Sequence, residues 1–369
     1  MTFKPLNEND IVNTRTLLHE AIPLTGTIVS GTYQAENVKQ YSHGMFESIY
    51  DYPYLSSSAN HIFDITLGVS TASPLYSLIT TTNGMASKKK NIYNQMAQVL
   101  MGYDATGSIQ AFDQDGDIIG GGTKIDNCFI IPFSRLLTKD EIKKETFSMQ
   151  LGVNSAYRNP FSNVITISDV SASTEYRVNS PAGEYGILYA TSSTSSSLNA
   201  SLAAQTSSIN GITYWYAGLI YYQAGVVVLT GSILGNLLQH GLIGGNKLVL
   251  DQDFQTDTSS SFTGSTISAS CEGFRHRIKN IQFNNTTELN STIYFCRANH
   301  NEFNYTSNPT YLTGSKIRVK SQATDNPVSY ITTVGLYNDN NELMATAKLS
   351  EPLKKSPATE FTIRTRLDY

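Results

Sequence analysis

The residues with the sharpest chemical spacing are the three aspartates of Asp113-Gln114-Asp115-Gly116-Asp117. Carboxylates at alternate positions are the ligands that a Ca²⁺-binding loop presents. An EF-hand loop also needs a bidentate glutamate at its twelfth position, where this chain has Lys124, and the flanking segments are rich in strand-forming residues. The Asp-Gly pair is instead typical of a tight turn between two strands. The spacing therefore predicts a turn and no metal site.

Other catalytic patterns are missing from the sequence. His19-Glu20 begins like a zinc-protease HExxH motif, but Pro23 stands where the second histidine belongs. The chain has no GxSxG nucleophile elbow, no P-loop and no dinucleotide fingerprint. Its histidines are scattered singly along the chain. We therefore expect no enzyme activity, no catalytic residues and no cofactor.

The charge and composition of the chain argue against nucleic acid as a partner and favour other proteins. Only 15% of the residues are charged, the net charge is −4, and the chain has 22 Tyr and 15 Phe against one Trp. A broad nucleic-acid-binding surface needs a basic excess, which this chain lacks. Tyrosine is favoured both in strands and at protein interfaces. The composition fits a β-rich protein whose surfaces are covered by other proteins.

Cysteine usage and apolar runs indicate where the chain folds. Three cysteines without a CxxC pair argue against a disulfide framework or a structural zinc site, and favour a reducing cytoplasm. The start of the sequence has no apolar leader segment. The longest apolar run, residues 217–229, is broken by Gln223 and Gly225 and is shorter than the roughly 18 residues of a membrane helix. We expect neither export nor a membrane span.

Short runs of strand-forming residues separated by Gly, Asn, Asp and Pro dominate the chain. This pattern predicts a mainly β fold of two or three β-sandwich-like domains or meanders with a few short helices. The best helix lies at residues 87–101, where apolar residues recur at helical spacing after a possible Ser87 cap. Weaker patterns predict helices at 10–21 and at 138–144.

Two Ser/Thr-rich stretches, residues 191–208 and 256–268, indicate domain boundaries. The first contains no aromatic and no charged residue, so it is expected to form a surface loop. The resulting division is an N-terminal mixed β domain (1–170) with a docking arm (1–24), a middle β segment (171–268) and a C-terminal β domain (269–369).

Aromatic side chains are the strongest candidates for protein contacts, because they are enriched at interfaces. Three groups stand out: Phe46, Tyr50, Tyr52 and Tyr54; Tyr214, Trp215, Tyr216, Tyr221 and Tyr222; and the final strand from Phe361 to Tyr369. We expect deletion of residues 361–369 to abolish assembly or folding, since this segment has a clean strand pattern.

The C-terminal run from Tyr330 to Tyr369 resembles a pattern in tail-associated virion proteins of phages. An apolar strand (VGLY) meets an Asn/Asp-rich turn (NDNN), followed by a strand of the ELMATAKL kind, a proline and a closing strand (FTIRTRL). Five further segments look like parts of uncharacterised virion structural proteins of contractile-tailed phages, namely residues 19–33, 41–68, 88–102, 177–186 and 272–285.

This resemblance implies a structural component of the tail, baseplate or neck, located in the virion and made in the host cytoplasm. Its implied partners are copies of itself and other virion structural proteins, and no catalytic residue transfers. Two other functions stay open. One is a receptor- or glycan-binding tail module, in which Tyr214-Trp215-Tyr216 and Tyr221-Tyr222 form a platform that stacks on sugar. The other is a polysaccharide hydrolase, whose paired carboxylates no sequence spacing reveals.

Overall fold

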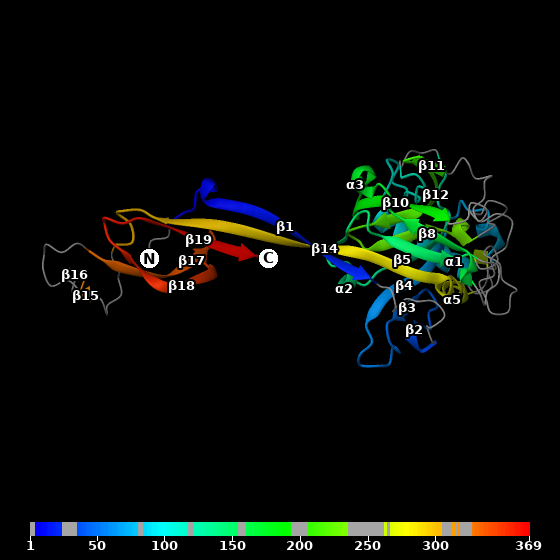
Figure 1. The fold of residues 1–369 in the computed structure, drawn as a ribbon, viewed down its shortest axis with the longest axis horizontal. Helices are drawn as coiled ribbons and strands as arrows, with labels where there is room; N and C mark the ends of the chain where they lie inside the picture. Colours follow the sequence, from blue (N-terminus) through cyan, green and yellow to red (C-terminus); the bar gives the residue numbers. More distant parts are fainter. Residues whose placement is uncertain are drawn as a thin grey trace. The chain divides into compact units, whose positions relative to one another are not determined.

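The computed structural model describes residues 4–23, 35–79, 84–116, 122–153, 160–192, 206–234, 262–263, 266–304, 312–313, 316–317 and 327–369. The chain divides into two compact units (Figure 1). Unit 1 combines residues 1–18 with 288–369, and unit 2 contains residues 19–287. These boundaries differ from the expected ones at 170 and 268. Most of the expected loop at 191–208 lies outside the described residues.

Two long strands, β1 (Ile11–Pro23) and β14 (Ile278–Ala298), pass from one unit into the other and are neighbours in the same sheet. The other strands of unit 2 are β2 (Val38–Gln40), β3 (Glu47–Tyr50), β4 (His61–Val69), β5 (Asn127–Pro132), β6 (Glu141–Ile142), β7 (Ser148–Gly152), β8 (Val164–Ser168), β9 (Arg177–Ser180), β10 (Gly183–Ser192), β11 (Thr206–Ile209), β12 (Ile212–Tyr221) and β13 (Val226–Thr230). Its α-helices are α1 (Met85–Leu100), α2 (Arg135–Thr138), α3 (Ala172–Glu175) and α5 (Ser268–His276), with short 3₁₀ turns between elements.

The strands of unit 2 form one antiparallel path in the order β14-β7-β8-β10-β12-β13-β5-β4-β3-β2. The path runs straight across the expected boundary at residue 170, because Tyr189 of β10 pairs with Ser168 of β8. The prediction of a mainly β fold is confirmed. The segments before and after residue 170 therefore share one sheet.

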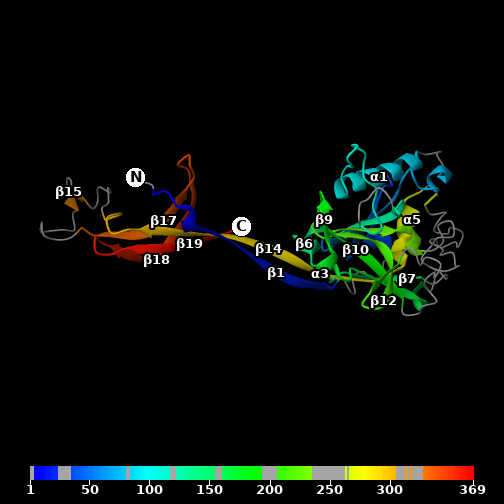
Figure 2. The ribbon, with the colours of Figure 1, turned by 90° about the horizontal axis from the view of Figure 1, so that it is seen from above.

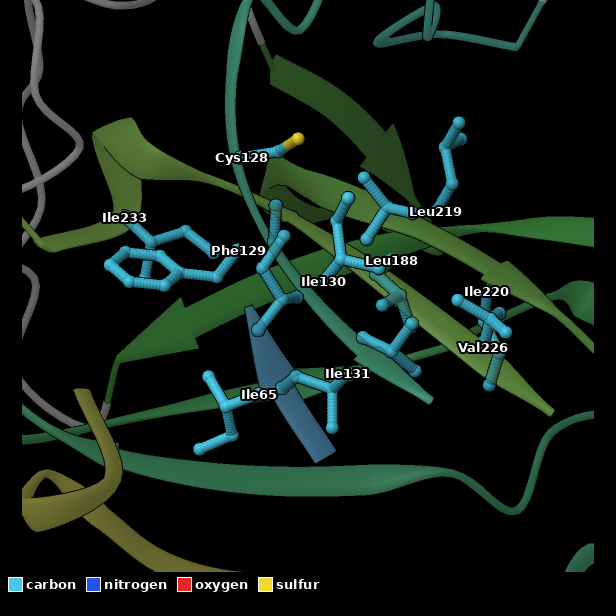
Figure 3. Packing of buried hydrophobic residues seen from close by; sticks show 14 of the residues in the cluster. Ile65, Cys128, Phe129, Ile130, Ile131, Leu188, Leu219, Ile220, Val226 and Ile233 are labelled. Atoms are coloured by element: carbon cyan, nitrogen blue, oxygen red, sulfur yellow. The ribbon is translucent and has the colours of Figure 1, made fainter. Parts of the chain in front are cut away.

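A single large apolar core lies wholly within unit 2. Phe129 of β5 is a fully buried member of this core, with its ring stacked on that of Phe274 of α5 at 4.5 Å and edge-on to that of Phe262 at 5.1 Å. Figure 3 shows Phe129 among apolar side chains of neighbouring strands. The central strands are buried on both faces, so their sequences are continuous apolar runs such as VVVLT in β13.

The expected helix at 87–101 is present as α1, which lies to one side of the strands (Figure 2). It begins at Met85 after Gly84, which takes a left-handed conformation, so Ser87 is inside the helix and is not its cap. α1 packs closely on β4 at Gly68, where a Cβ atom would lie 3.0 Å from the backbone of Tyr93. The hydroxyl of Tyr93 then donates a hydrogen bond to the carbonyl of Ile125.

Two expected helices are wrong. Residues 11–23 form strand β1, because β-branched Ile11, Val12, Thr14 and Thr16 favour a strand and β14 supplies a pairing partner. Hence the expected docking arm is paired within its own chain. Residues 138–144 end the short helix α2 and continue into strand β6, which pairs with β14. Long-range pairing overrides local helix patterns at both places.

Unit 1 contains the C-terminal half of β14, the pair β15 (Leu312–Thr313) and β16 (Lys316–Ile317), and strands β17 (Ser329–Tyr337), β18 (Leu343–Lys355) and β19 (Phe361–Asp368). β19 pairs antiparallel with residues 291–298 of β14, and β17 forms a hairpin with β18. The hairpin turn confirms the expected Asn-rich turn. Asn338 accepts a hydrogen bond from the Glu342 amide at 2.8 Å, and Asn341 has a φ of 63°.

The interior of unit 1 is thin. Among its described residues, Ile293 and Ala298 are the buried hydrophobic side chains. None of the residues of the large core belongs to this unit. Along β17, β18 and β19, half-buried and exposed residues alternate, as expected for strands with one apolar face. The apolar face is therefore present, but the single chain covers it incompletely.

No helix in the described part of the chain is both long and apolar enough to cross a lipid bilayer. Cys128 and Cys271 are buried and Cys296 is half-buried, and all three are free thiols.

The core position of Leu219 gives the first prediction. Leu219 is buried in β12, whereas Leu136 on α2 is 68% exposed. We expect Leu219→Ala to lower the free energy of unfolding of unit 2 by about 2–5 kcal/mol, because it leaves a cavity. The matched change Leu136→Ala should cost less than about 0.5 kcal/mol. Urea unfolding followed by circular dichroism measures both, and equal effects would contradict this placement of the core.

Candidate contact surfaces

The final strand is held along its whole length. Phe361 lies opposite Ala298, and Asp368 lies opposite Ser291. The backbone of Tyr369 exchanges two hydrogen bonds with that of Asn290, at 2.8 and 3.2 Å. The ring of Tyr369 is nevertheless 74% exposed, while Phe361 is half-buried. Of the two aromatic residues expected at contacts in this strand, Tyr369 is open to a partner and Phe361 belongs partly to the thin interior.

The hairpin of β17 and β18 presents one apolar face. Cross-strand partners share a face, and here they are Ile331 with Leu353, Val334 with Ala347, and Leu336 with Ala345. All of these side chains are half-buried. The opposite face carries exposed residues such as Thr332, Thr346 and Lys348. Figures 1 and 2 show the hairpin lying alongside β14 and β19 within unit 1.

The first aromatic group surrounds β3 and β4. The ring of Phe46 lies 4.8 Å from that of Tyr41, and the ring of Tyr50 lies 6.4 Å from that of Tyr54. Tyr52 is 58% exposed and Tyr54 is 37% exposed, whereas Phe46 and Tyr50 are half-buried. The structure therefore brings this group together, with Tyr52 and Tyr54 as its accessible members.

A Ser–Asp–His cluster lies beside these aromatic rings. Asp64 Oδ1 accepts hydrogen bonds from Ser48 Oγ at 2.5 Å and from His61 Nε2 at 2.7 Å, and this pairing raises the pKa of His61. A nucleophilic triad needs the serine hydroxyl to donate to the histidine, so that the histidine can take its proton. Here the carboxylate receives both donors, and Ser48 is buried. The cluster stabilises the β3–β4 pair and does not activate Ser48.

The second aromatic group is split by burial. Tyr214, Trp215 and Tyr216 at the start of β12 are half-buried, whereas Tyr221 and Tyr222 are completely buried. The end of β12 pairs with β10 on one edge and β13 on the other, and its last five residues are all buried, so both of its faces are covered. The expectation that Tyr221 and Tyr222 contact a partner is therefore corrected, because both belong to the core of unit 2.

Tyr222 instead binds a buried acid that sequence reasoning missed. Its hydroxyl donates to Asp169 Oδ2 at 3.1 Å, and the amides of Glu145 and Phe147 donate to the same carboxylate at 2.8 and 3.1 Å. Burial raises the pKa of Asp169 to about 7, and the three donors act in the opposite direction. Asp169 follows β8 and fastens residues 145–147 to it, which is a structural role.

Two more charged residues are buried where α1, α5 and β3 meet the core. Glu47 of β3 accepts a hydrogen bond from Gln40 at 3.0 Å, and burial raises its pKa to about 7, helped by the nearby Glu272. Lys89 of α1 donates from Nζ to the carbonyl of Phe262 at 2.5 Å, and burial lowers its pKa to about 8. No sequence signal marks these residues, because both look like ordinary surface charges.

Of the aspartates that resemble a Ca²⁺ loop, Asp113 lies directly before a bend of the chain and Asp115 lies in it. The carboxylate of Asp113 is buried and forms an ion pair with Lys124. Gly116 has a φ of 70°, as the turn requires, and Asp117 lies outside the described residues. Within the described part of the chain, no group of three or more His, Cys, Asp or Glu side chains is arranged to hold a metal ion.

Glu47 generates a pH prediction. Its folded pKa of about 7 is above its usual 4.5, so it binds a proton more tightly in the folded protein. Protonated Glu47 therefore contributes to the free energy of unfolding below pH 4.5. This contribution, which is up to roughly 3 kcal/mol, is lost as the pH rises to 7. Glu47→Gln should remove that loss and so stabilise unit 2 at pH 7 but not at pH 4.5.

The exposed Glu36, changed to Gln, serves as the matched control and should leave the pH profile as in the unchanged protein. Urea unfolding at pH 4.5, 5.5 and 7 provides the comparison. If Glu47→Gln and Glu36→Gln have the same profile, the buried state of Glu47 is refuted.

The pairing of β19 generates a second prediction. Truncation after Glu360 removes the partner of residues 291–298 of β14, so residues 288–360 should lose their resistance to protease while unit 2 keeps its own. Tyr369→Ala removes an exposed ring without removing the strand and should leave that resistance intact. Limited proteolysis with mass spectrometry tests this, and an equally resistant truncated chain would refute it.

Comparison with known proteins identifies no relative of this chain. The sequence matches no protein-family model and no curated protein, and the fold matches no solved structure.

Proposed function

We propose that this protein is a structural component of a tailed-phage virion, in the tail, baseplate or neck, and that it acts by packing against other proteins. The support has two parts. Segments along most of the chain resemble virion structural proteins of contractile-tailed phages. The second part is physical and comes from unit 1, whose strands have apolar faces that a single chain leaves partly uncovered.

The thin interior of unit 1 carries the proposal. Full burial of a Val, Leu, Ile or Phe side chain contributes about 1.5–3 kcal/mol, and partial burial contributes correspondingly less. Unit 2 obtains this stabilisation from its own large core, whereas the described part of unit 1 fully buries only Ile293 and Ala298 among its hydrophobic residues. Covering the remaining apolar surface with another protein would supply what the single chain lacks. An assembly protein has this property, and a self-contained enzyme does not need it.

Binding of a host-surface glycan is a second candidate, favoured by the first aromatic group. Tyr52 and Tyr54 are exposed, and Asp51 next to them holds the side chain of Asn60 by a hydrogen bond of 2.8 Å. Exposed aromatic rings beside carboxylate and amide groups suit a ligand with both apolar faces and hydroxyls. Retention of the purified protein on host polysaccharide, lost in Tyr54→Ala, would favour this role.

Immunogold electron microscopy tests the main proposal. Antibody raised against the purified chain should label intact phage particles at the tail, baseplate or neck. Label on the capsid would keep a structural role but refute the tail assignment. No label on intact and disrupted particles that do label for a known virion protein would refute the proposal as a whole.

A further inference from the structure

We propose that the side chains of Lys124 and Asp113 condense to an amide bond, which joins two facing segments of unit 2 covalently. The two residues lie directly opposite each other in an antiparallel bridge, and their side chains form an ion pair. This modification goes beyond the proposed role in a virion and does not depend on it, because both partners belong to one chain and one unit.

The backbone brings the two side chains as close together as an antiparallel pair allows. Two backbone hydrogen bonds flank the pair, from the Ile125 amide to the Phe112 carbonyl at 2.8 Å and from the Gln114 amide to the Thr123 carbonyl at 3.1 Å. Asp113 and Lys124 are therefore a non-hydrogen-bonded pair, the type whose side chains approach most closely. Two groups held in contact in this way react as if at a very high concentration.

Burial distinguishes this pair from other lysine ion pairs of the chain. The side chain of Asp113 is 0% exposed, whereas the carboxylates paired with Lys144 and Lys4 are 29% and 31% exposed. Burial raises the pKa of Asp113, although the hydrogen bond and the charge of Lys124 act in the opposite direction. A buried site thus favours the neutral pair of carboxylic acid and amine, which differs from the ion pair by the transfer of one proton. The neutral pair is the form that condenses.

Asp115 supplies a second carboxyl group beside the first. The protonated carboxyl of Asp113 donates a hydrogen bond to that of Asp115, and this contact also raises the pKa of Asp113. The amide of Asp115 donates to Asp113 Oδ1 at 3.4 Å, while Lys124 Nζ donates to Oδ2. Oδ1 is thereby placed to remain as the amide oxygen and Oδ2 to leave. Asp115 itself is half-buried, so it can exchange protons with solvent.

The reaction replaces one bond by another and needs no oxidant. The lone pair of neutral Lys124 Nζ forms a bond to Asp113 Cγ, and the bond from Cγ to Oδ2 breaks. The carboxylate of Asp115 takes a proton from Nζ and passes it to the departing oxygen, which leaves as water. The product is an amide and one water molecule, so the chain loses the mass of one water.

The bond would close residues 113–124 into a covalent ring. A closed ring leaves the unfolded chain fewer conformations, which stabilises the folded unit. Since the carbonyl carbon of the amide belongs to a buried side chain, water has little access to reverse the reaction.

Mass spectrometry of the denatured full-length chain tests the proposal. The unchanged protein should be lighter by one water than its sequence requires. Lys124→Arg should have its full expected mass, because arginine keeps the positive charge opposite Asp113 but lacks the nucleophilic amine. Asp115→Asn removes the proton carrier and should slow formation of the amide about a hundredfold or more.

Proteolysis of the denatured chain locates the bond. Trypsin should fail to cut after Lys124, because an acylated lysine is not its substrate, but should still cut after Lys144, whose partner Glu184 is partly exposed. A protease that cuts before aspartate separates residue 113 from residue 124, since Asp115 and Asp117 lie between them. The two resulting peptides should remain joined.

A different loss of water is possible at Asp115-Gly116, where an aspartate followed by glycine can close to a succinimide. That product leaves Lys124 open to trypsin and also forms in Lys124→Arg, so a loss of this kind overturns the inference. A chain that keeps its full mass after prolonged incubation at neutral pH overturns it as well. An amide that forms equally fast in Asp115→Asn refutes the part assigned to Asp115.

Discussion

Strand β14 is the constraint on which the rest of the structure depends. Its 21 residues contain no glycine and no proline, so the strand continues without a break from unit 2 into unit 1. Residues 278–286 pair with β7 and β6 in unit 2, and residues 291–298 pair with β19 in unit 1. A break in the middle of β14 would therefore affect both units, although each has its own set of contacts.

The two units use different means of stabilisation. Unit 2 has a large apolar core, and its buried charged side chains form hydrogen bonds that link separate elements of the unit. Arg277 donates to the carbonyl of Gly152 at 3.0 Å, Lys89 to that of Phe262, and Asp169 accepts from residues 145–147. Such groups are costly to bury, but each one permits few alternative arrangements of its neighbours. In unit 1, half-buried and exposed residues alternate along the strands, and few hydrophobic side chains are buried. Unit 1 therefore gains less stability from its own core than unit 2 does.

Local sequence patterns predict much of the fold, but they predict few of the residues that form the candidate contact surfaces and the buried charged groups. Strands such as β4 and β13, helix α1 and the turn at Asn338 follow from spacing and turn chemistry within a few residues. The local pattern of residues 10–21 predicts a helix, but the partner strand of β1 lies more than 250 residues away in the sequence, beyond the reach of local patterns. The same limit applies to Tyr222, whose burial depends on the strands beside it. Glu47 and Lys89 could not be found, since their sequence context does not differ from that of surface charges.

The order of the chain along unit 1 has a consequence for synthesis. Residues of β1 are made first, but their neighbours in unit 1 begin only at residue 288, and the pairing of β19 is complete only at Asp368. Unit 2 can close once residue 287 has left the ribosome, because its core needs nothing further. Unit 1 therefore completes its strand pairing only after the chain segment of unit 2 has been made. The larger unit can thus fold before the strands of unit 1 find their partners, because domains generally fold as units while the chain is being made.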